Sequence, residues 1–248
     1  HRDLHKEYRR QRQMCIRDRY EMGVVGVFTK ELDQALLQNE VDLCVHSMKD
    51  VPTQLPAGIV VGFVPDRGHA GEVLVFQEKN WKRLPQRTIA TSSLRRQAQW
   101  LFAYKNDRVV PLRGNIQTRL DKIKANNWDG AIFAQAGLER LSTDPTIYTP
   151  MDWMIPAPAQ GAIMVTTRAD ETKLLKSIKP LSHLPTQDCV RAERDFLRAL
   201  QGGCSAPIGA YATVQNDRIS FVGSVTATDG SRHIEVRESY DCLLYTSP

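Results

Sequence analysis

The chain has 248 residues, 42% of them hydrophobic and 25% charged, which is ordinary for a globular protein of one large or two to three small domains. No apolar run reaches the length of a membrane span, and no secretory signal pattern is present. The net charge of +5 comes mostly from residues 1–20, where seven basic side chains face three acidic ones. The remainder is nearly neutral, which argues against a nucleic-acid-binding protein.

The first part of the chain alternates between strand and helix patterns. The periodicity of apolar residues predicts helices over 28–40, 94–104 and 113–125, and strands over 41–45, 59–64, 72–76, 88–90, 109–112 and 129–134, with a turn at 136–137. Thr91-Ser92-Ser93 is a good N-cap cluster for the second helix. This alternation indicates an α/β fold with a parallel or mixed sheet.

The second part of the chain begins with a proline- and glycine-rich crossing at 156–161, interpreted as a hinge. A strand follows at 162–167, then a loop at 181–187, a helix at 188–201, and alternating β segments over 210–238 with turns at 216–217 and 229–230. These last elements predict a small α+β unit.

The five cysteines are odd in number and show neither a CxxC pair nor the spacing of zinc ligands. A reduced, cytoplasmic protein without a bound metal is therefore expected. Cys204 differs from the others because two glycines precede it and Pro207 follows, which places it on a loop where a thiol can react. Cys44 and Cys189 are interpreted as packed core thiols.

Polar clusters follow several predicted strands, at the edge where open α/β sheets bind ligands. They comprise Ser47, Lys49 and Asp50, then Thr91, Ser93, Arg95 and Arg96, and finally Arg113, Arg119 and Arg140. Arginine binds carboxylate and phosphate in a bidentate manner, and two adjacent arginines at a helix start are unfavourable for the helix dipole. The pattern favours a site for a ligand with many carboxylates.

Simpler, purely structural interpretations of several of these residues stay open. Arg119 fits a solvated helix face, Asp50 a turn before proline, and His46 a hydrogen-bonded residue at the end of a strand. Trp100, Phe102 and Trp128 fit the core better than a stacking platform.

Five motifs occur in an order that resembles the hydroxymethylbilane synthases, also called porphobilinogen deaminases. They are His46-Ser47-Met48-Lys49-Asp50-Val51-Pro52, Thr91-Ser92-Ser93-Leu94-Arg95-Arg96-Gln97, Leu112-Arg113-Gly114-Asn115 with Thr118-Arg119-Leu120, Ala136-Gly137-Leu138 with Arg140, and Gly202-Gly203-Cys204 with Pro207-Ile208-Gly209. The similarity covers residues 23–239.

The resemblance implies a transferase of tetrapyrrole (haem) biosynthesis that joins four porphobilinogen molecules head to tail with release of ammonia. It implies a dipyrromethane cofactor held by a thioether to Cys204, a catalytic role for Asp50, and Gln160 in the hinge. Carboxylates of cofactor and substrate would be bound by Ser47, Lys49, Thr91, Ser93, Arg95, Arg96, Arg113, Arg119 and Arg140, with Asp50 also contacting the cofactor. The cations around Asp50 are expected to favour its ionised form.

The implied fold is two α/β domains like those of periplasmic binding proteins and a small α+β domain with the cofactor loop. The expected divisions are 23–64 with 160–180 for an incomplete domain 1, 65–159 for domain 2, and 184–240 for the third. Residues 1–22 and 241–248 read as non-native tails resembling adaptor sequence. A monomer without nucleic acid or membrane partners is expected.

The sequence departs from the family at both ends, where the usual first strand and closing helix are not found. Two alternatives therefore stay open: an inactive fragment of the enzyme, or a periplasmic-type solute-binding module for a polycarboxylate. A solute-binding module of this type needs no reactive cysteine and normally has an export signal.

Overall fold

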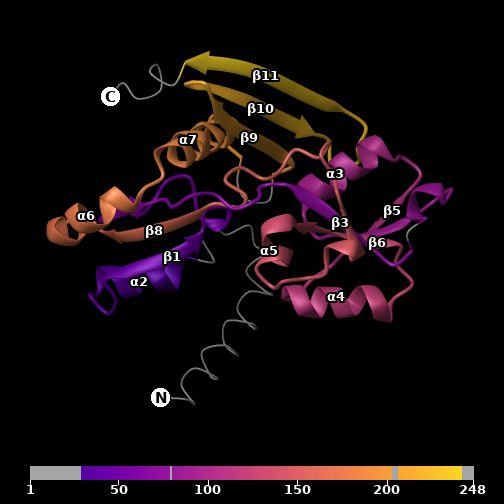
Figure 1. Cartoon of the computed structure of the whole chain (residues 1–248), viewed down its shortest axis with the longest axis horizontal. Coiled ribbons are helices and arrows are strands. Elements are labelled where there is room, and N and C mark those ends of the chain that lie inside the picture. The colour runs from indigo at the N-terminus through magenta and orange to yellow at the C-terminus, as the bar shows by residue number, and fades with distance from the viewer. Residues whose placement is uncertain (1–28, 79, 203–205, 242–248) are drawn as a thin grey trace, which may run out of the picture.

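The computed structural model describes residues 29–78, 80–202 and 206–241, which form three sheets with helices packed on them (Figure 1). The mixed α/β architecture with a small C-terminal sheet unit, expected from the sequence, is confirmed. Short 3₁₀ turns η1 (Met48–Asp50), η2 (Trp81–Arg83), η3 (Pro145–Ile147) and η4 (Lys179–Leu181) lie in the connections.

The first sheet combines two distant parts of the chain. Its strands are β1 (Leu43–Ser47), β8 (Ile163–Arg168) and β2 (Ile59–Phe63), in that order, and β8 is antiparallel to both neighbours. Helix α2 (Lys30–Leu37) packs on this sheet, and Leu36, Cys44 and Ile59 form a buried cluster between them. The sheet thus joins residues around 45 to residues around 165.

The second sheet has five strands in the order β5-β4-β6-β3-β7. Their bounds are β3 (Glu72–Phe76), β4 (Thr88–Ala90), β5 (Arg108–Val110), β6 (Gly130–Ala134) and β7 (Tyr148–Pro150), and the associated helices are α3 (Leu94–Ala103), α4 (Ile116–Ala125) and α5 (Gln135–Glu139). Successive side chains of a strand point to opposite faces, so Val73 and Val75 enter one core cluster and Leu74 the other. Both faces of this sheet are therefore covered.

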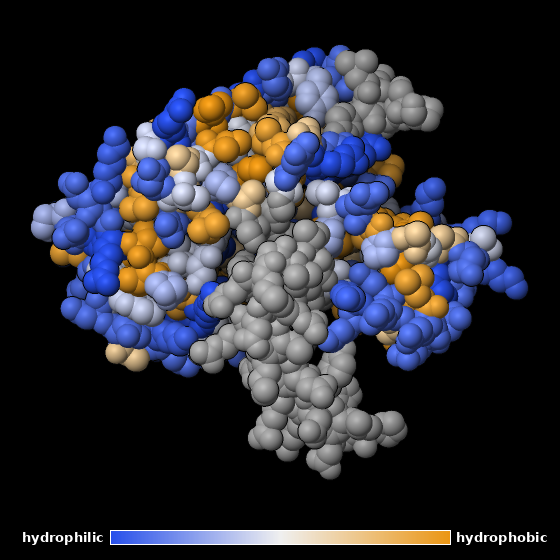
Figure 2. Space-filling view, turned by 180° about the vertical axis from the view of Figure 1, so that it is seen from behind, coloured by the Kyte–Doolittle hydropathy of each residue, from blue (hydrophilic) through white to orange (hydrophobic). Residues whose placement is uncertain are grey.

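The third sheet is an antiparallel meander with one long helix against it. Its elements are α7 (Leu184–Ala199), β9 (Ile208–Gln215), β10 (Arg218–Thr226) and β11 (His233–Asp241). The β9–β10 turn has positive φ at Asn216 and Asp217, as a two-residue hairpin turn requires. Strand β11 exposes Ile234 and Val236, and apolar surface is visible over this sheet in Figure 2.

Four elements differ from the sequence expectations. The turn at 136–137 is part of helix α5, and strand β7 and helix α6 (Thr172–Ile178) were not predicted. The loop predicted at 181–187 contains the start of α7 at Leu184, because Pro185 lies in the first helical turn, where no intrahelical N–H bond is needed.

Two crossing segments, 64–71 and 155–162, connect the first and second sheets and touch each other. The Gly68 N–H donates to the Gly161 carbonyl at 3.3 Å. Gly161 has φ +83°, and a Cβ there would lie 2.6 Å from the Gly68 carbonyl oxygen. Only glycine suits this contact, which brings the ends of both sheets together.

Candidate functional site between the first and second sheets

The polar run after β1 forms a compact turn. Ser47 ends the strand, and η1 carries Lys49 and Asp50. The Met48 N–H donates to the carbonyl of Ala162 at 3.0 Å, which ties the turn to the crossing before β8. Met48 is only 5% exposed, so the turn is anchored by its apolar residue while Lys49 and Asp50 remain half-buried.

Asp50 is more strongly affected by burial than by the charges around it. Burial raises the pKa of its carboxyl, whereas Lys49, a hydrogen bond from Ser47 and the charge of Arg119 act to lower it. The net direction is upward. The sequence expectation is that neighbouring cations favour the ionised form of Asp50. Each cation does lower the pKa, but the expectation is wrong for the net shift, because the loss of water on burial outweighs the cations.

Lys49 links the turn to the second crossing segment. Its Nζ donates to Gln160 Oε1 at 3.3 Å. Burial lowers the pKa of Lys49 to about 8, with Arg96 acting in the same direction and Asp50 and Glu72 against it. Lys49 therefore shares one electrostatic environment with residues of the second sheet.

The remaining predicted residues gather at one edge of the second sheet. Strands β4, β5 and β6 are parallel, so their carboxyl ends meet. Thr91, Ser93, Arg95 and Arg96 follow β4, Arg113 and Arg119 follow β5, and Arg140 follows β6. Ser92 joins two of these ends, since its Oγ accepts from the Leu112 N–H at 2.9 Å.

Ser93 is the N-cap of α3, as the sequence predicts. Its Oγ accepts from the Arg96 N–H at 3.4 Å, and Thr91 Oγ1 accepts from the Ser93 N–H at 3.2 Å. These hydroxyl groups order the start of the helix, so the first turn is presented in a fixed conformation.

Arg95 and Arg96 are held by a carboxylate that sequence reasoning missed. Glu72, at the start of β3, is 1% exposed and forms ion pairs with both guanidinium groups, at 2.7 Å for Arg96. Arg95 also donates to the Ile155 carbonyl, and Arg96 to the Ile132 carbonyl. Burial acts to raise the pKa of Glu72, but the two arginines outweigh it and hold that pKa below its usual value.

Arg113 and Arg140 have a different environment. Both are exposed, and neither guanidinium has a side-chain partner among residues 29–78, 80–202 and 206–241. Arg119 is half-buried and its Nε donates to the Gly114 carbonyl at 2.7 Å. The edge therefore has deep, paired arginines beside outer ones that are open to a ligand.

Cys204 lies outside the described residues, between α7 and β9. Helix α7 is well anchored. Glu193 is fully buried, and its carboxylate accepts from both Nη atoms of Arg67 at 2.6 and 3.0 Å. It also accepts from the N–H groups of Ala159 and Ala212 at 2.6 and 2.8 Å. One side chain thus connects α7, β9 and both crossing segments.

Several alternative interpretations are settled by burial and contacts. Cys44 and Cys189 are buried and form no disulfide within the described part of the chain, and Trp100 is fully buried, as expected. His46 is 8% exposed and its Nε2 lies 3.1 Å from Thr166 Oγ1, so it is a hydrogen-bonded strand residue. The expectation for Phe102 is wrong, because this ring is 42% exposed.

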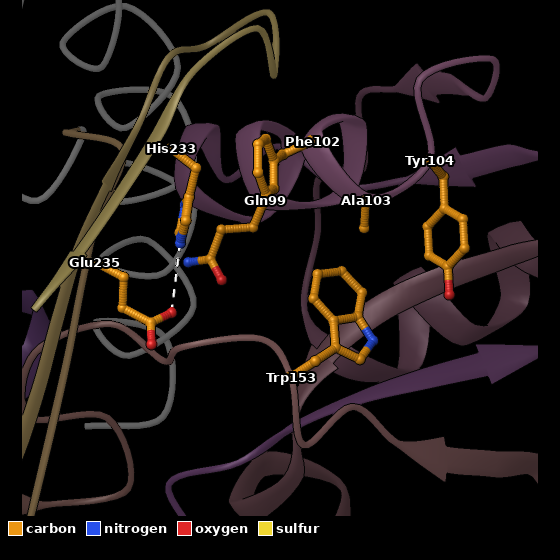
Figure 3. A pocket seen from close by; sticks show the side chains of 7 residues that line it. All are labelled: Gln99, Phe102, Ala103, Tyr104, Trp153, His233 and Glu235. Carbon is orange, nitrogen blue, oxygen red and sulfur yellow. Dashed lines mark hydrogen bonds and ion pairs between the residues drawn. The ribbon is translucent and has the colours of Figure 1, made fainter. Parts of the chain in front are cut away.

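Phe102 lines a cavity of about 390 Å³ (Figure 3). Its ring stacks on His233 of β11 with centroids 4.8 Å apart. Trp153 and Tyr104 form another wall, and Glu235 projects from β11 beside His233. The cavity belongs to the junction of α3 with the third sheet, and none of the predicted site residues borders it.

Two groups of residues escaped sequence reasoning: Glu72, which pairs with the adjacent arginines, and the pair Arg67 and Glu193. A lone glutamate at the start of an apolar strand was the available signal for Glu72, because a charge there needs a partner. Arg67 and Glu193 are 126 positions apart and sit in segments whose local patterns show nothing unusual.

Two protein-family models match the chain. "Porphobilinogen deaminase, dipyromethane cofactor binding domain" matches residues 13–176, and "Porphobilinogen deaminase, C-terminal domain" matches residues 187–242. The porphobilinogen deaminase of Pelotomaculum thermopropionicum is 46% identical over 216 residues, covering 85% of this chain and 69% of that protein. The one from Brevibacillus brevis is 43% identical over 217 residues, covering 85% and 70%.

Among solved structures, the periplasmic VFT2 domain of Bordetella pertussis BvgS is similar with a TM-score of 0.37 and 14% identity, over 68% of this chain and 72% of that one. None of the helices in the described part of the chain combines the length and apolar character of a membrane span. The same residues contain no cluster of His, Cys, Asp and Glu suited to a metal ion.

Glu72→Gln is expected to lower the free energy of unfolding by about 3–5 kcal/mol, because it leaves two buried guanidinium groups without a counter-charge. Urea denaturation measures this change. Glu171→Gln is the matched control: Glu171 pairs with Arg168 but its side chain is 38% exposed, so a loss under about 1 kcal/mol is expected. Equal, small losses in both variants would contradict a structural role for Glu72.

Proposed function

The chain belongs to the porphobilinogen deaminase family, and on that premise we propose that the turn after β1 and the carboxyl edge of the second sheet carry out the family's reaction. Its function is that of a hydroxymethylbilane synthase, a transferase that joins four porphobilinogen molecules head to tail and releases ammonia. The observation that carries the residue assignment is the contact of the turn with the crossing segment that leads from the second sheet: Lys49 donates to Gln160 at 3.3 Å. In line with this proximity, Arg96 acts on the pKa of Lys49 and Arg119 on the pKa of Asp50.

The family's dipyrromethane cofactor fits the donors present at this edge. Its acetate and propionate groups are carboxylates, which arginine and lysine bind best. Arg113 and Arg140 are exposed without side-chain partners among the described residues, and the buried Nε of Arg96 has no hydrogen-bond acceptor in that part of the chain. We propose that these groups, with Ser47, Lys49, Thr91, Ser93, Arg95 and Arg119, bind the carboxylates of cofactor and substrate.

The cofactor, when bound, supplies the pyrrole carbon to which porphobilinogen is joined. The chain's own residues do the rest. The outer arginines neutralise the carboxylates and fix the orientation of each pyrrole ring. Asp50, as the carboxylate, accepts hydrogen bonds from pyrrole N–H groups and stabilises the positive charge that develops as ammonia leaves. Glu72 holds Arg95 and Arg96 in place for this task.

We also propose the finer properties expected from the sequence: a cytoplasmic monomer that binds porphobilinogen and neither nucleic acid nor membrane. Cys44 and Cys189 form no disulfide among the described residues, which supports a reducing compartment. The near-neutral charge beyond residue 20 supports the absence of a nucleic-acid partner. The monomeric state remains a prediction from the resemblance.

The attachment of the cofactor to Cys204 is tested by the intact mass of the purified chain and of its Cys204→Ser variant. A mass increment of dipyrromethane size is expected only where Cys204 is present. Cys189→Ser serves as a control, because that thiol is buried and packed. An increment retained in Cys204→Ser would contradict the attachment site, and its absence from every variant would favour the solute-binding alternative.

Asp50→Asn is expected to reduce turnover by about 100-fold or more, since the amide keeps the shape but loses the charge that stabilises the cationic transition state. Steady-state assays and thermal unfolding measure activity and folding separately. Asp42→Asn, at the other end of β1, is the control and should be near wild type, because Asp42 is 84% exposed. Turnover like wild type in Asp50→Asn would overturn the catalytic assignment.

The pKa of Lys49, about 8, predicts a pH effect on substrate binding. The ammonium group is charged below that pH and loses its proton above it, so KM is expected to rise as pH increases through about 8. Lys49→Arg should abolish this rise because arginine stays protonated. Lys124→Arg, at an exposed position of α4, should leave the pH profile unchanged. A rise in KM that persists in Lys49→Arg would assign the titration to another group.

A further inference from the structure

Arg194 of α7 contacts the turn that carries Lys49 and Asp50. Its Nη1 donates to the carbonyls of Met48 at 3.2 Å and Val51 at 2.9 Å, and its Nη2 donates to the carbonyl of Pro52 at 2.5 Å. The three acceptors flank Asp50 on both sides. One guanidinium group therefore fixes the backbone on either side of the catalytic aspartate.

Two of these carbonyls, those of Val51 and Pro52, lie just beyond η1, and Met48 and Val51 are only 5% and 3% exposed. A buried carbonyl needs a donor, and Arg194 supplies one to Val51. The Met48 carbonyl also accepts from the Val51 N–H at 3.2 Å, so Arg194 adds a second donor there. A guanidinium has five N–H donors in a rigid plane and can serve several carbonyls at once. A lysine ammonium is a point charge on a flexible stem and cannot reproduce that fork.

Helix α7 is a firm base for this contact. The preceding residue, Glu193, is fully buried and bound to Arg67 and to the backbone of both the second crossing segment and β9. Residues 193 and 194 thus attach the helix to the crossing segments and to the catalytic turn.

We propose that Arg194 is a positioning residue for the transferase reaction: its guanidinium holds the backbone at 48–52 and thereby fixes the Asp50 carboxylate relative to the cation-lined edge of the second sheet. This inference rests on the proposed role of Asp50. Arg194 acts through the backbone of the turn. A purely structural clamp between α7 and the first sheet would affect stability alone.

Arg194→Gln removes the charge and most of the donors. The expected result in the cofactor-loaded enzyme is a fall in kcat of about 100-fold, the size associated with a misplaced catalytic group, with KM changed only a few-fold. Hydrogen exchange read by mass spectrometry should be at least about 10-fold faster in peptides covering 48–52, and unchanged in β9 and β10. Intact mass should show the same cofactor loading as wild type.

Two further variants sharpen the test. Arg194→Lys keeps the charge and restores some of the hydrogen bonds, so kcat should recover to within about 10-fold of wild type. Arg198→Gln is the matched control on the same helix, because Arg198 is 65% exposed and pairs with Asp195 one turn away. Its kcat and its exchange at 48–52 should equal those of the wild-type enzyme.

The inference is overturned if Arg194→Gln has wild-type kcat, or if its activity falls only in proportion to the folded fraction with unchanged exchange at 48–52. Should Arg194→Gln not fold, Arg194→Lys decides the question: a several-fold fall in kcat with faster exchange at 48–52 supports the inference, and wild-type values of both overturn it. Asp50→Asn is measured in parallel. If it is active, the proposed role of Asp50 fails; if it is inactive while Arg194→Gln is normal, only the role of Arg194 fails.

Discussion

Glu193 places a negative charge in the interior, where it is neutralised by Arg67 and by two backbone N–H groups. A buried carboxylate is costly unless every lone pair finds a donor, so the four donors must stay in place together. They come from two crossing segments and from β9, and Arg67 also donates to the Gln160 carbonyl at 2.8 Å. The relative positions of the three sheets depend on this requirement.

Gln160 extends the same network to the chemical residues. Its backbone carbonyl binds Arg67, its Nε2 donates to the Ala70 carbonyl at 2.7 Å, and its Oε1 accepts from Lys49. The side chain is 1% exposed, so these bonds are protected from water. A residue in the crossing thereby links the anchored helix α7 to the lysine beside Asp50.

The arginines of the second sheet divide into two kinds by their surroundings. Arg95 and Arg96 are buried and oriented by Glu72, whereas Arg113 and Arg140 are exposed at the same edge. Because carboxylates compete with water, a site with both kinds can combine a fixed inner cation cluster with outer groups that adapt to a growing polyanion. The aromatic ring of Phe102 takes no part in this arginine cluster, since it stacks on His233 of β11.

The sequence by itself determined the elements and the chemical types at their ends. The N-cap at Ser93, the strand β3 and the hairpin turn at Asn216-Asp217 all follow from residues within four positions of one another. The start of α7 was missed because Pro185 reads as a breaker, although it is tolerated in a first turn. The motif order indicated the family and therefore the reaction.

Only the tertiary structure decided which charges meet. Glu72 and Arg95 are 23 positions apart, Arg67 and Glu193 are 126, and Arg194 and Val51 are 143. Such pairs depend on sheet order and on how the two crossing segments pack. The local periodicity of the sequence predicts neither. The tertiary structure also decided the upward direction of the Asp50 pKa. Burial causes this shift and is a property of the folded chain, whereas the sequence shows only the neighbouring cations.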